Sequence, residues 1–179
     1  LDHTTMDVML QEVRAFLSGR TEALLTPVPF RNFVAQARLG VSLKEHARFF
    51  AERLGDVTES TAPFGVMDVH GDATTLTQER MLMDTGLASR LRDQARRLGV
   101  SPATVLHVAW ARTVAALSGR DDVVFGTVLL GRMNSSTGSD RALGMFINTL
   151  PIRAKVAPGA PGVRDAVRQM HDELAELLK

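Results

Sequence analysis

Two apolar runs constrain the fold of this chain more than any other feature. They cover residues 122–132 (DVVFGTVLLGR) and 143–153 (LGMFINTLPIR). Both are rich in β-branched and aromatic residues and are bounded by Gly, Asp or Ser, as is typical of β-strands. Few polar residues interrupt them, so we expect strands that are buried on both faces. Asn148 breaks the second run, and a buried amide without partners costs about 1–3 kcal/mol. We therefore expect Asn148 to be buried and hydrogen-bonded, in a polar network or at a cavity wall.

Helical patterns surround the two predicted strands. Ser42-x-x-Glu45 is a capping box, and Ser101-Pro102 places a capping serine before a proline at the first helical position. Apolar spacing and such signals predict helices over residues 7–17, 30–39, 42–54, 85–98, 101–117 and 163–178. Residues 74–83 predict a further strand. This interleaving of helices and strands favours a layered α/β fold.

The helix predicted over residues 101–117 is apolar on nearly every side. We therefore expect it to be buried, with Trp110 in the core and His107 as a hydrogen-bonded core histidine. No two histidines stand four residues apart with a carboxylate in a metal-binding pattern, so we predict no metal site.

Composition excludes several classes of protein. The net charge is +1, and the basic residues are interleaved with acidic ones, which gives no case for a nucleic-acid partner. The sequence contains no run of 18 apolar residues, so it predicts no membrane-spanning helix. Its first residues do not show the pattern of a signal peptide. There is no Cys, which excludes disulfides, a thiol nucleophile and a Cys-type zinc site and is compatible with the cytoplasm.

The same apolar runs carry a resemblance to a known family. The segment GRDDVVFGTVLLGR, the polar loop after it and LGMFINTLPIR resemble the condensation domain of nonribosomal peptide synthetases. The family motif is close to GxFVNTLPxR, and residues 144–153 fit it almost residue by residue. Residues 101–120 also resemble the family's helix at that place. The resemblance implies a chloramphenicol acetyltransferase-like α/β fold, a two-layer sandwich of two lobes around a tunnel.

The resemblance covers only part of such a domain, which is about twice this length or more. The chain begins with Leu1 rather than Met, so we expect a fragment. Residues 1–60 would be the end of the N-terminal lobe, residues 61–73 a linker, and residues 74–179 part of the C-terminal lobe. The remainder of the condensation domain would then be a partner of this chain.

An HxxxD pattern near the start resembles the family's HHxxxDG motif. In that alignment Asp2 stands at the first His, His3 at the second, Asp7 at the Asp and Val8 at the Gly. The resemblance implies that His3 is catalytic and that Asp7 holds the loop by a salt bridge. Asp2 and Val8 depart from the motif, since a carboxylate beside His3 favours imidazolium and Val narrows the space that Gly leaves. Both an active site of modified chemistry and an inactive site are therefore consistent with the sequence.

Further residues are expected around that histidine. Asn148 and Arg153, like Asp7, are candidates for structural support of the site. Gly126 and Gly144 are candidates for the wall of the substrate tunnel, although a bulge or a strand end explains Gly126 equally well. Arg132, like Arg153, ends a strand and either pairs with an aspartate or lies in solvent.

The resemblance implies an enzyme that forms an amide bond between a carrier-bound acyl thioester and a carrier-bound amine. Phosphopantetheine would belong to the carrier domains, so no cofactor would bind directly, and an adjacent adenylation domain is a further expected partner. The imidazole would take the amine proton or stabilise charge in the tetrahedral intermediate. We expect this chain alone to be inactive. Two alternatives stay open, a non-catalytic condensation-like domain that recruits assembly-line partners and a coenzyme A-dependent acyltransferase.

Overall fold

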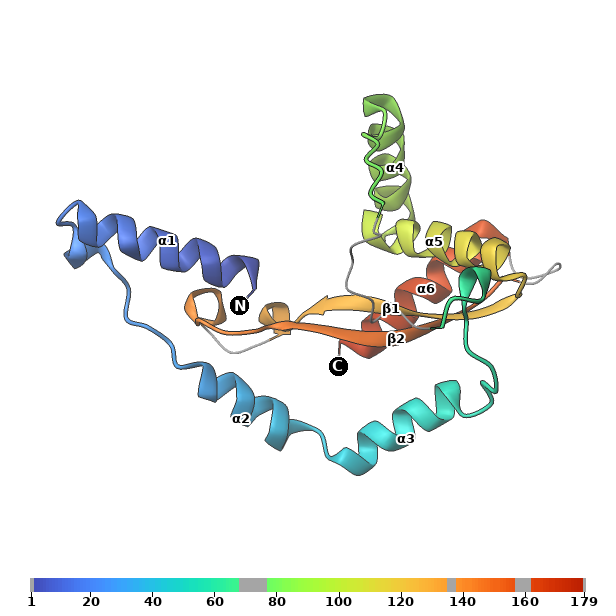
Figure 1. Cartoon of the computed structure of the whole chain (residues 1–179), viewed down its shortest axis with the longest axis horizontal. Coiled ribbons are helices and arrows are strands. Elements are labelled where there is room, and N and C mark those ends of the chain that lie inside the picture. Colours follow the sequence, from blue (N-terminus) through green and yellow to red (C-terminus); the bar gives the residue numbers. More distant parts are fainter. Residues whose placement is uncertain (1, 68–76, 135–137, 157–161, 179) are drawn as a thin grey trace. The chain divides into compact units, whose positions relative to one another are not determined.

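The structure is a computed structural model of the 179-residue chain and describes residues 2–67, 77–134, 138–156 and 162–178. Its helices and strands follow one another along the chain as Figure 1 shows. They are α1 (His3–Leu17), α2 (Phe30–Gly40), α3 (Leu43–Leu54), α4 (Thr85–Leu98), α5 (Pro102–Ser118), β1 (Asp122–Leu130), β2 (Ile147–Lys155) and α6 (Val163–Leu177). Short 3-10 turns stand between them, named η1 (Thr21–Ala23), η2 (Pro63–Gly65), η3 (Gly131–Asn134) and η4 (Ser139–Arg141).

The chain divides into two compact units, and both strands pass from one to the other. The first unit comprises Leu1–Asp56 and Thr127–Leu150, and the second comprises Val57–Gly126 and Pro151–Lys179. Strands β1 and β2 pair with each other. Next to the paired strands, the Gly131 N–H donates to the Phe146 carbonyl and the Val156 N–H donates to the Asp121 carbonyl, which identifies an antiparallel pair.

Local sequence signals explain where the helices begin and end. The Ser42–Glu45 capping box is present at α3, and Ser101 caps α5 with Pro102 at its first position, which confirms both predictions. Gly99 ends α4 with a φ of 70°, a left-handed conformation that favours glycine. Helix α1 is the exception, because it begins at His3, four residues before the predicted start.

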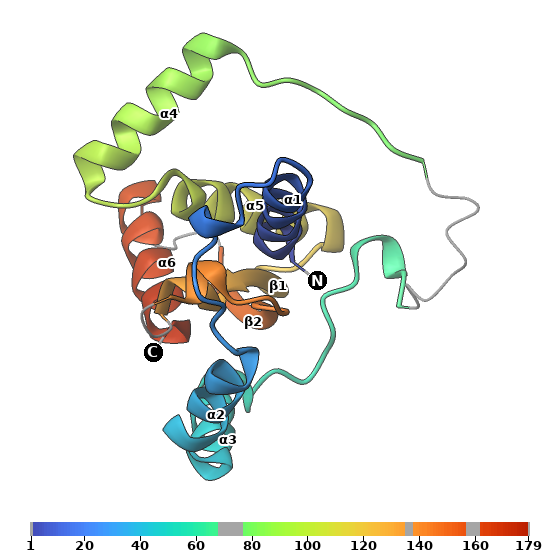
Figure 2. The same cartoon turned by 90° about the vertical axis from the view of Figure 1, so that its left-hand side faces the viewer.

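The core of the second unit lies where α5 and α6 meet the strands. Val108 of α5 packs with Ile152 of β2 and with Val167 and Met170 of α6, and all four are buried. A second cluster joins Val123 of β1 to the buried Ala111, Val114 and Ala115 of α5. Helices α5 and α6 lie side by side in both views (Figure 1, Figure 2).

Two predictions about burial are wrong. Val128 and Leu130 of β1 are 61% and 50% exposed, so the strands are not buried on both faces. Val123 and Phe125, which alternate along β1, supply its contacts to the core clusters, so the described helices cover one face there. Helix α5 is likewise not buried all round, since Trp110 is 53% exposed.

Other predictions meet the structure only in part. His107 is half-buried, and its Nδ1 lies 2.7 Å from the Ala103 carbonyl, so it is hydrogen-bonded as predicted but not fully in the core. Residues 77–83 form no strand, while residues 74–76 of that predicted strand and residues 68–73 of the predicted linker lie outside the described residues. No helix in the described ranges is long and apolar enough to cross a membrane.

Candidate functional site

The first turn of α1 carries two buried polar side chains. Asp2 caps the helix, and its Oδ1 accepts a hydrogen bond of 2.8 Å from the Thr5 backbone N–H. Aspartate is a favoured N-cap because its oxygen satisfies an amide that has no partner inside the helix. Asp2 is 4% exposed and Thr5 is fully buried, whereas their neighbours His3 and Thr4 are exposed. The turn therefore points Asp2 and Thr5 into the first unit.

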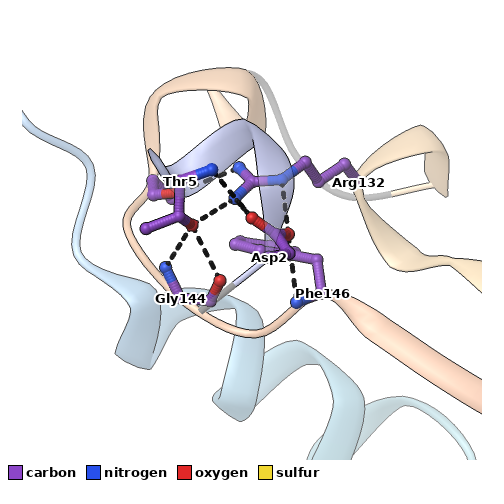
Figure 3. A network of polar contacts seen from close by, with 6 residues as sticks. Asp2, Thr5, Arg132, Gly144 and Phe146 are labelled. Carbon is purple, nitrogen blue, oxygen red and sulfur yellow. Dashed lines mark hydrogen bonds and ion pairs between the residues drawn. The ribbon is translucent and has the colours of Figure 1, made fainter. Parts of the chain in front are cut away.

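Arg132, just after β1, pairs with the Asp2 carboxylate. Its Nε donates to Oδ2 at 3.0 Å and its Nη2 donates to Oδ1 at 2.7 Å, which is a bidentate contact (Figure 3). Nη1 of the same guanidinium donates to the Ala142 carbonyl at 2.9 Å. The Arg132 side chain is 11% exposed, so the ion pair is buried on both sides. Such a pair fixes the relative orientation of its two side chains, because the planar guanidinium donates two hydrogen bonds to the two oxygens of the carboxylate.

The loop that leads into β2 is tied to the same two side chains. The Thr5 hydroxyl donates to the Gly144 carbonyl at 2.8 Å and accepts from the Gly144 N–H at 3.1 Å. It also accepts from Arg132 Nη2 at 2.8 Å, and the Phe146 N–H donates to Asp2 Oδ2 at 3.3 Å. Figure 3 shows these bonds converging from α1 and the loop.

An aromatic cluster covers the other side of this loop. The centre of the Phe146 ring lies 4.5 Å from that of Phe33 and 5.1 Å from that of Phe30, and both of these residues belong to α2. The Arg132 guanidinium lies 4.0 Å from the centre of the Phe146 ring. A Cβ atom on Gly144 would stand 2.1 Å from the Phe30 ring, so only glycine leaves room for that ring against the loop.

The hydrogen bonds from Arg132 hold the pKa of Asp2 well below its ordinary value, although burial alone would raise it. The hydrogen bond from the Thr5 backbone N–H lowers this pKa further. Asp2 is therefore an anion in the folded chain, and its role is to hold the arginine and the loop rather than to move a proton.

This direction of shift gives the Asp2–Arg132 pair a defined dependence on pH. Because the pKa is depressed on folding, the stability that Asp2 contributes is present above its unfolded pKa of about 3.9 and is lost as the pH falls toward the lower folded pKa. We expect the difference in urea unfolding midpoint between the wild-type full-length protein and its Asp2→Asn variant to be constant above about pH 5 and to shrink below about pH 4. A gap of equal size at pH 7 and pH 3 would contradict this assignment.

The structure places His3 and Asp7 on exposed parts of α1. His3 is the first residue of the helix, and Asp7 lies one turn later. Within the described ranges, the Asp7 carboxylate makes no ion pair, so the salt bridge that the resemblance implies for it stays a prediction. Asp2, on the inner side of the first turn, makes a buried salt bridge of its own. A catalytic role for His3 stays a prediction.

The remaining predicted residues divide between the two units. Asn148 is exposed rather than buried, and its Oδ1 accepts from the next backbone N–H at 2.9 Å. Gly144 belongs to the network of the first unit. In the second unit, Arg153 makes a bidentate pair with Asp122, at 2.8 and 2.6 Å, and Gly126 is exposed within β1. Both strand-ending arginines thus pair with aspartates, one of the two outcomes that the sequence allowed.

Sequence reasoning missed Thr5 and the role of Asp2. One signal was present for Asp2, because an aspartate immediately ahead of an apolar helical run is a typical N-cap residue. Nothing in the local sequence pairs Asp2 with an arginine 130 residues away. The described residues hold no group of three or more His, Asp or Glu side chains that could hold a metal ion.

Comparisons with known proteins agree with the resemblance. A family model described as "Condensation domain" matches residues 1–179. The chain is 46% identical to malpibaldin synthetase and 47% identical to malpinin synthetase of Mortierella alpina, each over 178 residues. These matches cover 99% of this chain but only 3% and 2% of the two synthetases.

A solved structure supports the fold. The first condensation domain of the CDA synthetase superposes with a TM-score of 0.70 at 20% identity, and the match covers 99% of this chain and 40% of that one. The predicted partial α/β fold of the chloramphenicol acetyltransferase type is thereby confirmed. With a family model matching its whole length, the chain belongs to the condensation domain family.

Proposed function

We propose that the complete domain containing this chain forms an amide bond between an acyl thioester on one carrier domain and an amine on another. The match of the condensation domain model over residues 1–179 carries this proposal. The chain spans less than half of the solved domain and a few per cent of the related synthetases, so the activity is proposed for the complete domain. Carrier domains with phosphopantetheine arms, an adjacent adenylation domain and a cytoplasmic location belong to the same proposal.

The chemistry needs both tethered substrates held in line more than it needs a strong nucleophile. The amine attacks the thioester carbonyl, the tetrahedral intermediate collapses, and the carrier thiol leaves. Holding two reactants in a reactive geometry lowers the barrier by about 7–11 kcal/mol at best, while proton transfer by one histidine contributes about 10²–10⁴-fold. The Asp2–Arg132 network serves the first need, because it fixes the turn that opens α1.

The direct test uses the complete domain with its two neighbouring carriers, loaded by the parent synthetase's own adenylation domains. We expect the amide product on the downstream carrier, detected by mass spectrometry of the intact carrier. Loaded carriers without the condensation domain give the background. Binding of both carriers without any amide would instead favour the recruiting domain, and transfer from free coenzyme A thioesters alone would favour the acyltransferase.

The buried pair also bears on which histidine acts. The sequence assigned His3 with Asp7, but the aspartate that makes the salt bridge is Asp2. If Asp2 is the aspartate of HxxxD, the histidine stands four positions before it, ahead of the first residue of this sequence. In that register the departures at Asp2 and Val8 disappear, and His3 takes the place of the glycine. The second register thus agrees with the contacts of Asp2, while His3 departs from the glycine of the motif.

The two registers make opposite predictions for His3→Ala in the complete domain. The register with Asp2 predicts turnover within about tenfold of wild type and an unchanged melting temperature, because the His3 side chain is exposed at the first helical position. A loss of about 10²–10⁴-fold with folding retained would return the role of the base to His3. The measurement is single-turnover amide formation beside a thermal melt of each protein.

A further inference from the structure

Thr5 joins two segments of the first unit through one hydroxyl group. The hydroxyl has one proton and two lone pairs, and all three are used. The proton goes to the Gly144 carbonyl, and the lone pairs accept from the Gly144 N–H and from Arg132 Nη2. Thr5 is fully buried, so none of these bonds is exchanged for water.

The contacts of Gly144 show what this hydroxyl does. Both backbone polar groups of Gly144 bond to Thr5, as they would to a neighbouring strand. The other side of the residue faces the Phe30 ring, with no room for a Cβ atom. The loop is therefore held between a polar clamp from α1 and an aromatic wall from α2.

We infer that Thr5 is a positioning residue for the condensation reaction. Its hydroxyl sets the first turn of α1, which carries Asp2 and His3, against the loop that leads into β2. Asp2 and Arg132 also bond backbone groups of this loop, at Phe146 and Ala142, while Thr5 bonds both polar backbone groups of Gly144. The inference rests on the proposed amide-forming activity, because only that activity gives the alignment a consequence.

The chain offers a matched control on the same helical turn. Thr5→Val keeps the branched shape, removes the acceptor of two N–H groups and removes the donor to the Gly144 carbonyl. In this variant the Thr5 backbone N–H still donates a hydrogen bond to Asp2, the N-cap of α1. Thr4→Val makes the same chemical change at the neighbouring, exposed threonine. Thr5→Ser keeps the hydroxyl and loses only the methyl group.

In the complete domain we expect Thr5→Val to lower kcat for amide formation by about 10–100-fold at a temperature well below its melting point, with KM for the loaded carriers unchanged. Thr5→Ser should retain kcat within about threefold, and Thr4→Val should match wild type. Hydrogen exchange at the Gly144 amide should be at least about tenfold faster in Thr5→Val and unchanged in Thr4→Val.

A merely structural role makes a different prediction. The melting temperature of Thr5→Val would fall while kcat of the folded protein stayed at the wild-type value, and that result would overturn the inference. If Thr5→Val does not fold, Thr5→Ser decides, because a large loss of kcat with the hydroxyl present would contradict a hydroxyl clamp. If the wild-type domain forms no amide, the proposed function fails, whereas Gly144 exchange still reports separately on the clamp.

Discussion

Replacement of Asp2 by alanine is expected to lower the free energy of unfolding of the complete condensation domain by about 3–5 kcal/mol. The substitution leaves the Arg132 guanidinium, 11% exposed, without the carboxylate that binds it at two atoms. It also removes the cap of α1 and the acceptor of the Phe146 N–H. Breaking a buried pair from one side is costly because the remaining charge stays buried.

Asp7→Ala is the matched control, because it removes the same side chain from the exposed side of the same helix. We expect its effect to stay within about 0.5 kcal/mol. Urea denaturation of the two variants and the wild type, followed by tryptophan fluorescence and circular dichroism, measures the difference. Equal losses in both variants would show that Asp7 has a buried partner in the complete domain, and a larger loss in Asp7→Ala would reverse the assignment.

Local structure was predictable because its causes lie within a few residues. Ser42 and Glu45 satisfy each other's backbone groups at the start of α3, and Ser101 with Pro102 begins α5. Thr85 and Leu98 bound α4 as the apolar spacing predicts. In each case the signal and the structure that it produces belong to the same helix.

Burial was less predictable, because it depends on what packs against an element rather than on the element's own residues. The helix that carries Trp110 is apolar on nearly every side, yet α4, α6 and η2 contact only part of it in the described structure. Asn148 shows the same limit. Its neighbours Ile147 and Leu150 suggest a core strand, but the side chain is exposed and bonds to the next backbone amide.

The candidate site shows how a motif can be recognised while two registers for it remain to be distinguished. HxxxD fixes a spacing, and the sequence contains that spacing at His3 and Asp7. Only the ion pair with Arg132 distinguishes Asp2 from Asp7, and that pair joins residues 130 positions apart. Long-range pairing of this kind follows from the topology of α1 and β1, which no local pattern contains.

The 179-residue chain alone is expected to give no amide product above background when both carriers are loaded. The chain covers 40% of the solved condensation domain, so more than half of such a domain is absent from it. The first unit shows the consequence on α1, where six large apolar side chains are at least 39% exposed: Met6, Met9, Leu10, Val13, Phe16 and Leu17. A helix with such a face needs an apolar partner to form a closed site.

An open site loses the alignment of the two tethered substrates and the exclusion of water, which together account for a rate factor on the order of 10⁵ or more. The measurement compares the isolated chain with the complete domain at equal concentration, with product read by mass spectrometry of the downstream carrier. Circular dichroism of the isolated chain separates an unfolded sample from a folded but inactive one. Turnover by the isolated chain within about 100-fold of the complete domain would show that these 179 residues contain the reacting groups, and that would return His3 and the register with Asp7 to the centre of the mechanism.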